Sequence, residues 1–128
     1  MQRNMDLIRN LMLALEAMPM EMGDSVEVAP GYPQIAQVKG ADAEIEYHLD
    51  LLRSAGFLHC TRGQPMIGVM IKGLTWTGHD FVDSVRSEDT WTKTKSVAHK
   101  AGGWTVSLLI DIAKSVIKAE VGKHLPGL

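Results

Sequence analysis

Apolar residues recur at helical spacing in the middle of the chain, and the recurrence stops at a glycine. Ile45, Leu49 and Leu52 follow an i, i+4, i+7 spacing, which places their side chains on one face of a helix. Gly56 comes directly after this helix, where a left-handed backbone favours a residue without a Cβ atom. An apolar run of strand type begins at once with Phe57. The pattern therefore predicts a central helix that passes at Gly56 into a β-strand.

Two strands are predicted after this glycine. Residues 57–60 and 66–71 are short apolar runs, and Arg62–Pro65 joins them in a tight connection that contains glycine and proline. The short connection predicts an antiparallel hairpin. A helix that leads through a glycine into such a hairpin is typical of the second half of a winged helix, in which the hairpin is the wing. We therefore expect a short wing at residues 57–71.

The chain before the central helix predicts one clear helix and one irregular region. An amphipathic stripe predicts an N-terminal helix from about Asn4, which can cap it, to Met18. Val26–Val28 is compatible with a short strand, and Asp42 is expected to cap the central helix. Between them, residues 33–39 are compatible with a helical turn or with a short strand. Whether they form the second helix of a helix-turn-helix stays open.

Three more helices are predicted after the hairpin. Thr75 is expected to cap the first of them, with Trp76 packed on the hairpin and Gly78 lying close to a strand. A second helix is expected from about residue 87 to Lys100, ended by the glycine pair at 102–103. The third begins near residue 105, with Thr105 or Ser107 as its cap, and is expected to end at Gly122 or at Pro126.

Together these elements predict an α+β fold in a single domain that spans residues 1–128. Its winged-helix-like core, at residues 1–86, consists of the N-terminal helix, the central helix and the hairpin wing. Residues 87–128 add C-terminal helices. A chain of 128 residues with 45% hydrophobic residues can bury a core without help from a metal or a disulfide.

The composition also predicts where the protein works. Cys60 is the one cysteine, so no disulfide can form within the chain, which fits a reducing cytoplasmic location. The N-terminal stretch carries carboxylates and is not a signal peptide. No apolar run approaches the roughly 18 residues that a membrane span needs, so we expect no membrane partner.

Candidate catalytic and metal-binding side chains are few and badly spaced. His79 and Asp80 are neighbours, and adjacent helix residues point about 100° apart, so they form no acid–base pair. His59 and Cys60 would lie on opposite faces of a strand and cannot easily hold one metal ion. His48 is expected to pack near a helix end and bond to a backbone carbonyl. The sequence thus predicts no enzyme, no metal site and no cofactor.

Charge is distributed unevenly along the chain and bears on nucleic-acid binding. Residues 1–56 contain four basic and nine acidic residues, whereas residues 91–128 contain six lysines and two carboxylates. The central helix, which in many winged helices enters the major groove, carries four carboxylates against Arg53 alone, and these would repel phosphates. A duplex-binding mode would therefore use basic residues on and beyond the wing. The candidates are Arg53, Arg62, Lys72, Lys93, Lys95 and Lys100.

The last predicted helix has a continuous apolar stripe. This stripe can form a homodimer interface, or it can pack on the N-terminal helix of its own chain, and the pattern favours neither. The candidate interface residues are Leu109, Ile110, Ala113, Val116 and Ile117.

Three segments together resemble a known family. They are residues 3–9 (RNMDLIR), residues 47–49 (YHL) and residues 74–83 (LTWTGHDFVD), and they occur in the same order as in a small phage and bacterial family, domain of unknown function 2513. Trp91 and the C-terminal helix continue the resemblance over most of the chain. It implies a winged-helix-like fold, often encoded by prophages, and no particular activity.

These observations lead to two hypotheses about function. The first is a non-enzymatic regulator of a phage or prophage that binds double-stranded DNA, as a homodimer. The alternative is an adaptor or inhibitor that uses the same scaffold to bind a host or phage protein without contacting DNA. The fold alone does not distinguish them.

Overall fold

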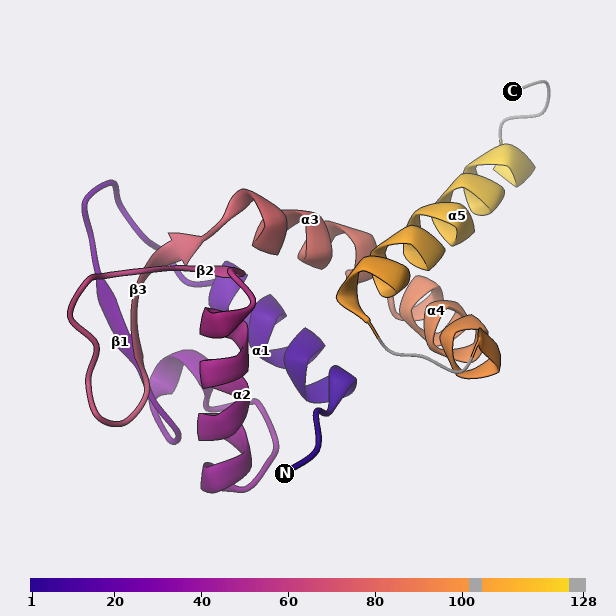
Figure 1. The fold of residues 1–128 in the computed structure, drawn as a ribbon. Coiled ribbons are helices and arrows are strands. Elements are labelled where there is room, and N and C mark those ends of the chain that lie inside the picture. The colour runs from indigo at the N-terminus through magenta and orange to yellow at the C-terminus, as the bar shows by residue number, and fades with distance from the viewer. Residues whose placement is uncertain (102–104, 125–128) are drawn as a thin grey trace. The chain divides into compact units, whose positions relative to one another are not determined.

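The computed structural model describes residues 1–101 and 105–124 of the chain (Figure 1). Within these ranges the fold is mixed α+β, with five α-helices and a three-stranded antiparallel sheet. The chain divides into two compact units, Met1–His79 and Asp80–Leu128. The first unit contains α1 (Met5–Glu16), β1 (Val26–Val28), the 3-10 helix η1 (Pro33–Ile35), α2 (Asp42–Ser54), β2 (Leu58–Cys60) and β3 (Val69–Leu74). Helix α3 (Trp76–Val85) begins in the first unit and continues in the second, which also contains α4 (Glu88–Ala101) and α5 (Val106–His124).

Helix α1 begins where the sequence predicts. The Asn4 side chain accepts a hydrogen bond from the backbone N–H of Leu7 at 3.1 Å, so the predicted cap is confirmed. Leu11, Met12 and Leu15 are buried on its inner face. The helix ends at Glu16, two residues before the predicted end at Met18.

Helix α2 keeps the predicted apolar face but not the predicted cap. Ile45, Leu49 and Leu52 are buried, as their spacing predicts. The capping residue is Ala41, which offers no side-chain bond, and Asp42 is the first residue of the helix itself. The prediction that Asp42 is the cap was therefore wrong by one position, although its carboxylate still lies in the first turn, where it favours the helix dipole. Gly56 follows the helix with a φ of +75°, as predicted.

The sheet has the strand order β1-β3-β2, and both pairings are antiparallel. Helices α1 and α2 both pack against β3 (Figure 1). The predicted strand at 26–28 is confirmed, and so is the hairpin of β2 and β3. The predicted strand at residues 66–71 was wrong in its bounds, because β3 starts only at Val69 and runs on to Leu74. The connection is therefore longer than the predicted Arg62–Pro65 turn and extends from Thr61 to Gly68.

Residues 33–39, which the pattern left open, contain a single 3-10 turn. Pro33 begins it, and Ile35 is buried beneath it. The backbone N–H of Val38 then bonds to the carbonyl of Ile35 at 3.0 Å. The segment that would be a second helix in a helix-turn-helix is thus one short turn.

The start of α3 confirms two predictions and corrects a third. Thr75 caps the helix by accepting from the N–H of Gly78 at 3.1 Å, and its hydroxyl donates to the carbonyl of Gly56 at 2.6 Å. A Cβ on Gly78 would lie 2.3 Å from the carbonyl oxygen of Phe57, so the predicted close approach is confirmed. Trp76 does not pack on the hairpin, since it is 84% exposed. It stands two residues before the inward-facing glycine, about 200° away around the helix, and therefore points outward.

The described part of the second unit is helical except at residues 86–87 and at Thr105. Phe81, Val82 and Val85 are fully buried, and α4 packs against α5. Thr105 caps α5 by accepting from the N–H of Leu108 at 3.1 Å. The prediction that Gly122 ends this helix was wrong, because α5 continues to His124 and nothing crowds the glycine. The ends predicted at 102–103 and at Pro126 lie outside the described residues, and none of the described helices is long and apolar enough to cross a bilayer.

Candidate interaction surface beside the central helix

The loop between β2 and β3, Thr61–Gly68, is held in place by side chains, and we call it the tip loop. Its last residue is fastened to α2, because both carboxylate oxygens of Glu46 accept from the N–H of Gly68 at 2.8 Å. Gly68 has a φ of +82°, and a Cβ there would lie 2.2 Å from the carbonyl oxygen of Val28. Any side chain at this position would clash with the Val28 carbonyl and strain the backbone, so the turn by which the loop rejoins the sheet requires glycine.

Gln64 fastens the middle of the tip loop to β3. Its side-chain amide donates to the carbonyl of Met70 at 3.0 Å and accepts from the N–H of Met70 at 3.0 Å. The carboxamide thus gives the N–H of Met70 the acceptor that a neighbouring strand would otherwise supply, and it shares the carbonyl of Met70 with the backbone N–H of Thr61, which donates to it at 3.1 Å. Thr61 adds a hydroxyl bond to the carbonyl of Gly63 at 2.6 Å. These side-chain bonds hold the loop although its own backbone is irregular.

The tip loop presents two large apolar side chains to solvent. Met66 is 101% exposed and Ile67 is 65% exposed, although both follow directly after the fastened Gln64–Pro65 segment. Tyr47 on α2 and Met1 are exposed as well, by 38% and 69%. Exposed apolar side chains that gather on one surface are a mark of interaction sites.

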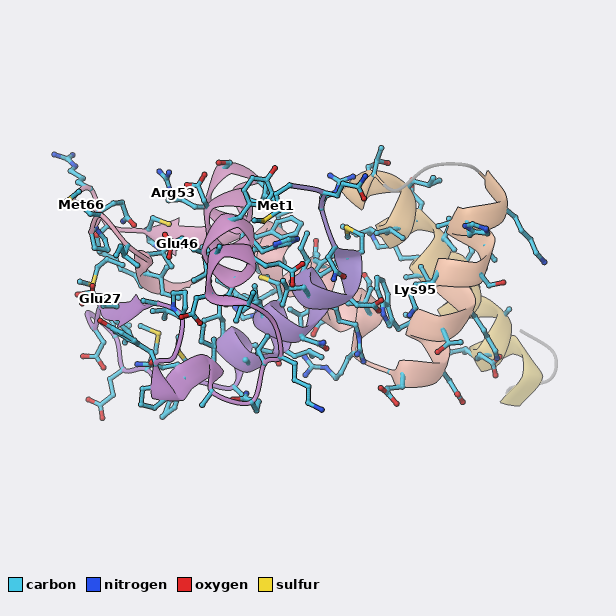
Figure 2. The ribbon with its side chains drawn as sticks, turned by 90° about the horizontal axis from the view of Figure 1, so that it is seen from below. Met1, Glu27, Glu46, Arg53, Met66 and Lys95 are labelled. Atoms are coloured by element: carbon cyan, nitrogen blue, oxygen red, sulfur yellow. The ribbon has the colours of Figure 1, made fainter. Side chains whose placement is uncertain are left out.

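Met1, Tyr47 and Met66 border a hollow between α2 and the tip loop, whereas Ile67 lies outside its lining. The hollow measures about 540 Å³, and both Met1 and Met66 line it. Figure 2 shows Glu46 and Arg53 on α2, with Met66 farther out on the same side. All of its lining residues belong to the first unit. They are Met1, Ala43, Glu46, Tyr47, Asp50, Arg53, Gln64, Pro65, Met66 and Gly68.

The α2 side of this hollow is acidic. Glu46 and Asp50 line it, and Asp42, outside the lining, continues their four-residue spacing, so the three carboxylates form one row along the helix. Arg53 donates to Asp50 at 2.5 Å, and this hydrogen bond, together with the charge of the carboxylate, raises the pKa of the guanidinium. Because Arg53 is paired with Asp50, it does not offset the charges of Asp42 and Glu46, and this surface of α2 carries a net negative charge.

His48 lies behind this surface and joins α2 to the start of α1. The ring is fully buried, and its Nε2 accepts from the backbone N–H of Asn4 at 2.8 Å. Because Nε2 is an acceptor, the ring proton is on Nδ1, which donates to the carbonyl of Glu44 at 2.8 Å. The expectation that His48 packs and bonds to a backbone carbonyl is confirmed. Its role is structural, since neither nitrogen is available to a ligand.

The basic residues expected to contact nucleic acid are divided between the two units. In the first unit, Arg53, Arg62 and Lys72 are exposed on α2, the tip loop and β3. In the second unit, all three candidates lie on α4. Lys93 donates to Glu120 at 2.5 Å, a bond that raises its pKa, and the Lys95 ammonium lies 5.6 Å from the centre of the Trp91 ring. The remaining candidate, Lys100, is exposed.

The expected dimer residues on α5 differ in exposure. Leu109 and Ala113 are fully buried, so other parts of this chain already cover them. Ile110 and Val116 are half-buried, and Ile117 is 37% exposed. The exposed apolar side of this helix continues through Val121. A dimer through α5 stays a prediction and would have to use this outer side.

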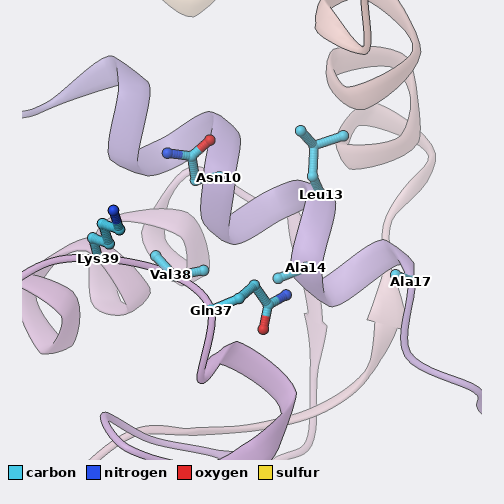
Figure 3. A pocket seen from close by; sticks show the side chains of 7 residues that line it. All are labelled: Asn10, Leu13, Ala14, Ala17, Gln37, Val38 and Lys39. Carbon is cyan, nitrogen blue, oxygen red and sulfur yellow. The ribbon is translucent and has the colours of Figure 1, made fainter.

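A second hollow, of about 440 Å³, lies beside α1 and is bordered by residues 37–39 (Figure 3). Small apolar side chains form much of its wall, and Lys39 is the charged residue among the seven that line it. It therefore lacks the acid–base pair that a catalytic site needs. Its lining residues are Asn10, Leu13, Ala14, Ala17, Gln37, Val38 and Lys39.

The described residues provide neither an activated thiol nor a cluster of metal-binding side chains. Cys60 is half-buried on β2, and burial raises the pKa of its thiol more than nearby Arg53 lowers it. A thiol of this kind is a poor nucleophile at neutral pH. In the described ranges, no group of three or more histidine, cysteine, aspartate or glutamate side chains is arranged to hold a metal ion.

Sequence reasoning missed the most exposed part of the candidate surface. Met66 and Ile67 were assigned to a strand because they continue an apolar run, whereas the structure places them in the tip loop. Gly68, directly after them, was the available signal, because a glycine inside an apolar run often marks a break in the strand. The roles of Glu46 and Gln64 had no signal of their own.

Comparison with known proteins gives three findings. An uncharacterized protein of Haemophilus influenzae is 28% identical over 128 residues, and the alignment covers 98% of this chain and 99% of that protein. No solved structure matches the chain. The resemblance inferred from the three sequence segments is confirmed by a family profile that matches residues 2–104. The chain belongs to the family of hypothetical proteins DUF2513.

Proposed function

We propose that the first unit is a winged-helix-like module that binds a protein partner through the tip loop and the outer face of α2. The order of its elements supports the winged-helix assignment: a helix, a strand, a short helical turn, a helix and a hairpin. The strand order β1-β3-β2, with the N-terminal strand beside the last one, is also that of a winged helix. In this reading α2 is the helix before the wing, and the tip loop is the end of the wing.

The main support for this proposal is that Met66 and Ile67 are exposed on a loop whose backbone is held in place by hydrogen bonds. Glu46 and Gln64 make hydrogen bonds that hold the loop on both sides of these residues, while the two side chains stay in solvent. Burying a side chain of this size at an interface contributes about 1.5–3 kcal/mol. A loop held in place before binding loses less conformational entropy when it binds. Both features are those of an anchor at a protein interface.

Charge argues against duplex DNA at this surface. The row of Asp42, Glu46 and Asp50 would face phosphates, and Arg53 is already engaged with Asp50. DNA binding therefore stays the weaker candidate. It would depend on Lys93, Lys95 and Lys100 on α4, of which the first is paired with Glu120.

The test is a comparison of captured proteins. The full chain, the double variant Met66→Ser/Ile67→Ser and the control Met22→Ser are immobilised and exposed to lysate of cells that carry the gene. Met22 is a matched control, because it is also fully exposed but lies in the loop before β1. We expect a protein that is retained by the control and reduced at least tenfold by the double variant, and that then binds the purified chain in calorimetry.

Captured proteins that bind the double variant with the same affinity as the original chain would contradict the proposal. Titration of a labelled DNA duplex at ~50 mM and ~200 mM salt gives the second arm. Salt-sensitive binding that is lost in Lys93→Ala/Lys95→Ala/Lys100→Ala would favour the DNA hypothesis instead.

A further inference from the structure

We infer that the hollow between α2 and the tip loop accepts a basic amphipathic helix of the partner protein, an inference that rests on the proposed function. Three features support it: the spacing of the carboxylates on α2, the apolar side chains beside them, and the backbone N–H groups of Gly68 and Met70, which are already bonded within the chain.

The carboxylate row has the length and repeat of a helix face. Asp42, Glu46 and Asp50 are four residues apart, so the row spans two turns and about 12 Å of α2. A helix lying alongside α2 presents its own side chains at the same repeat. Lysine or arginine side chains at i and i+8 of that helix would meet the exposed carboxylates of Asp42 and Asp50. Glu46 adds its negative charge between them, although both of its oxygens already accept from the N–H of Gly68.

Apolar side chains stand next to this row. Ala43 and Tyr47 follow Asp42 and Glu46 by one residue each, so they form a second row about 100° around α2. Pro65 and Met66 of the tip loop line the opposite side of the same hollow. A volume of about 540 Å³ falls within the range of ~300–1,000 Å³ of ordinary binding pockets. The apolar face of an amphipathic helix would fill it, in the helix-in-groove manner.

Other occupants fit this hollow less well. An extended strand binds by pairing with free backbone groups, but the N–H of Gly68 is bonded to Glu46 and that of Met70 to Gln64. An acidic helix would face the carboxylate row, and Arg53 is already paired with Asp50. The charge excess thus selects a basic partner.

The inference is tested with three synthetic helical peptides of equal length added to the isotope-labelled full chain. One has leucines on one face and lysines on the other, the second replaces the lysines with glutamates, and the third replaces the leucines with serines. Backbone amide shifts are recorded at ~50 mM and ~300 mM salt. We expect the leucine–lysine peptide alone to shift the amides of α2 and the tip loop, with an affinity that falls at least tenfold at the higher salt.

Charge variants identify the groups responsible. Asp42→Asn/Asp50→Asn is expected to weaken binding of the leucine–lysine peptide at least tenfold. The control Glu21→Gln/Asp24→Asn removes two carboxylates from the loop before β1 and is expected to leave it unchanged. An equal loss in both variants would mean attraction by overall charge and would overturn the inference.

The outcomes separate the inference from the proposal on which it rests. Binding of the leucine–glutamate peptide at α2 and the tip loop would overturn the basic-helix inference and leave the interaction surface in place. Shifts from the leucine–lysine peptide that lie elsewhere, or no shifts from any peptide, would also overturn the inference. Shifts that persist unchanged in Met66→Ser/Ile67→Ser would contradict the proposed surface as well.

Discussion

The carboxylate of Glu46 accepts two contacts from the N–H of Gly68, each at 2.8 Å, across 22 residues of sequence. This contact joins the helix before the hairpin to the loop at the hairpin's end. It explains how an irregular loop can hold Met66 and Ile67 in solvent. It also means that one of the carboxylates that oppose DNA binding has a structural use.

Removing the Glu46 carboxylate is expected to loosen the tip loop. A hydrogen bond to a charged group contributes about 1.5–3 kcal/mol, and this one is partly buried. Glu46→Ala should therefore lower the free energy of unfolding by about 1–2 kcal/mol and raise the exchange rate of the Gly68 amide by about tenfold or more. Chemical denaturation and hydrogen exchange measure the two effects.

Asp50→Ala is the control for this prediction. It removes the same charge from the same helix, but the carboxylate of Asp50 is paired with Arg53 at the exposed surface. Such exposed pairs contribute little to stability, so Asp50→Ala should have a small effect and Gly68 exchange should not change. Equal effects of the two variants on the Gly68 amide would show that Glu46 does not hold the loop.

Gly68→Ala is expected to be strongly destabilising. The backbone at Gly68 has a φ of +82°, and the added Cβ would lie 2.2 Å from the Val28 carbonyl oxygen. Strain and the displaced sheet contact together should cost about 3 kcal/mol or more. Gly63→Ala, in the same loop, meets no atom within 4 Å and should change stability by less than about 1 kcal/mol. A Gly68→Ala protein as stable as Gly63→Ala would contradict the described path of the loop.

His48→Leu is expected to weaken the joint between α1 and α2. Leucine keeps much of the buried volume but leaves the N–H of Asn4 and the carbonyl of Glu44 without their partner. Asn4 is exposed and Glu44 is half-buried, so water can reach both groups. A lost hydrogen bond of this kind costs about 0.5–1.5 kcal/mol, and we expect a total loss of about 1–2 kcal/mol by thermal or chemical unfolding. His59→Gln changes an exposed histidine on β2 and should have little effect. A loss below about 0.5 kcal/mol for His48→Leu would rule out these bonds.

The thiol of Cys60 is expected to react slowly in the folded protein. Burial raises its pKa, so less thiolate is present at pH 8 than in the unfolded chain, and alkylation by iodoacetamide should be several-fold slower. The raised pKa of Cys60 also determines whether the free energy of unfolding rises or falls with pH. The unfolded chain releases the thiol proton at lower pH, so the free energy of unfolding falls as pH rises above the ordinary thiol pKa of ~8.5. Cys60→Ser should remove this part of the pH dependence, and equal alkylation rates in the folded and unfolded chains would contradict the shift.

Features decided by neighbouring residues were predictable from the sequence. The buried face of Ile45, Leu49 and Leu52 follows from the helical repeat alone. The left-handed backbone at Gly56 follows from the steric freedom of glycine after a helix. Asn4 acts as a cap because its side chain bonds to an N–H only three residues away.

Features decided by distant residues were not predictable. Met66 and Ile67 have the apolar character of a strand, and only the contact of Gly68 with Val28 and Glu46 takes them out of the sheet. His48 illustrates both cases. Its bond to Glu44 is local and was expected, whereas its bond to Asn4 joins residues 44 positions apart and has no local pattern.

The central claim is that the tip loop holds its apolar side chains on a backbone as rigid as that of α2. Nuclear magnetic relaxation of the backbone amides of Gln64, Met66, Ile67 and Gly68 measures this most directly. The fastened loop predicts order parameters of about 0.8 or higher, close to those of α2, and a fall in the Glu46→Ala variant. Order parameters below about 0.6 in the original protein would mean a mobile loop and would contradict the claim.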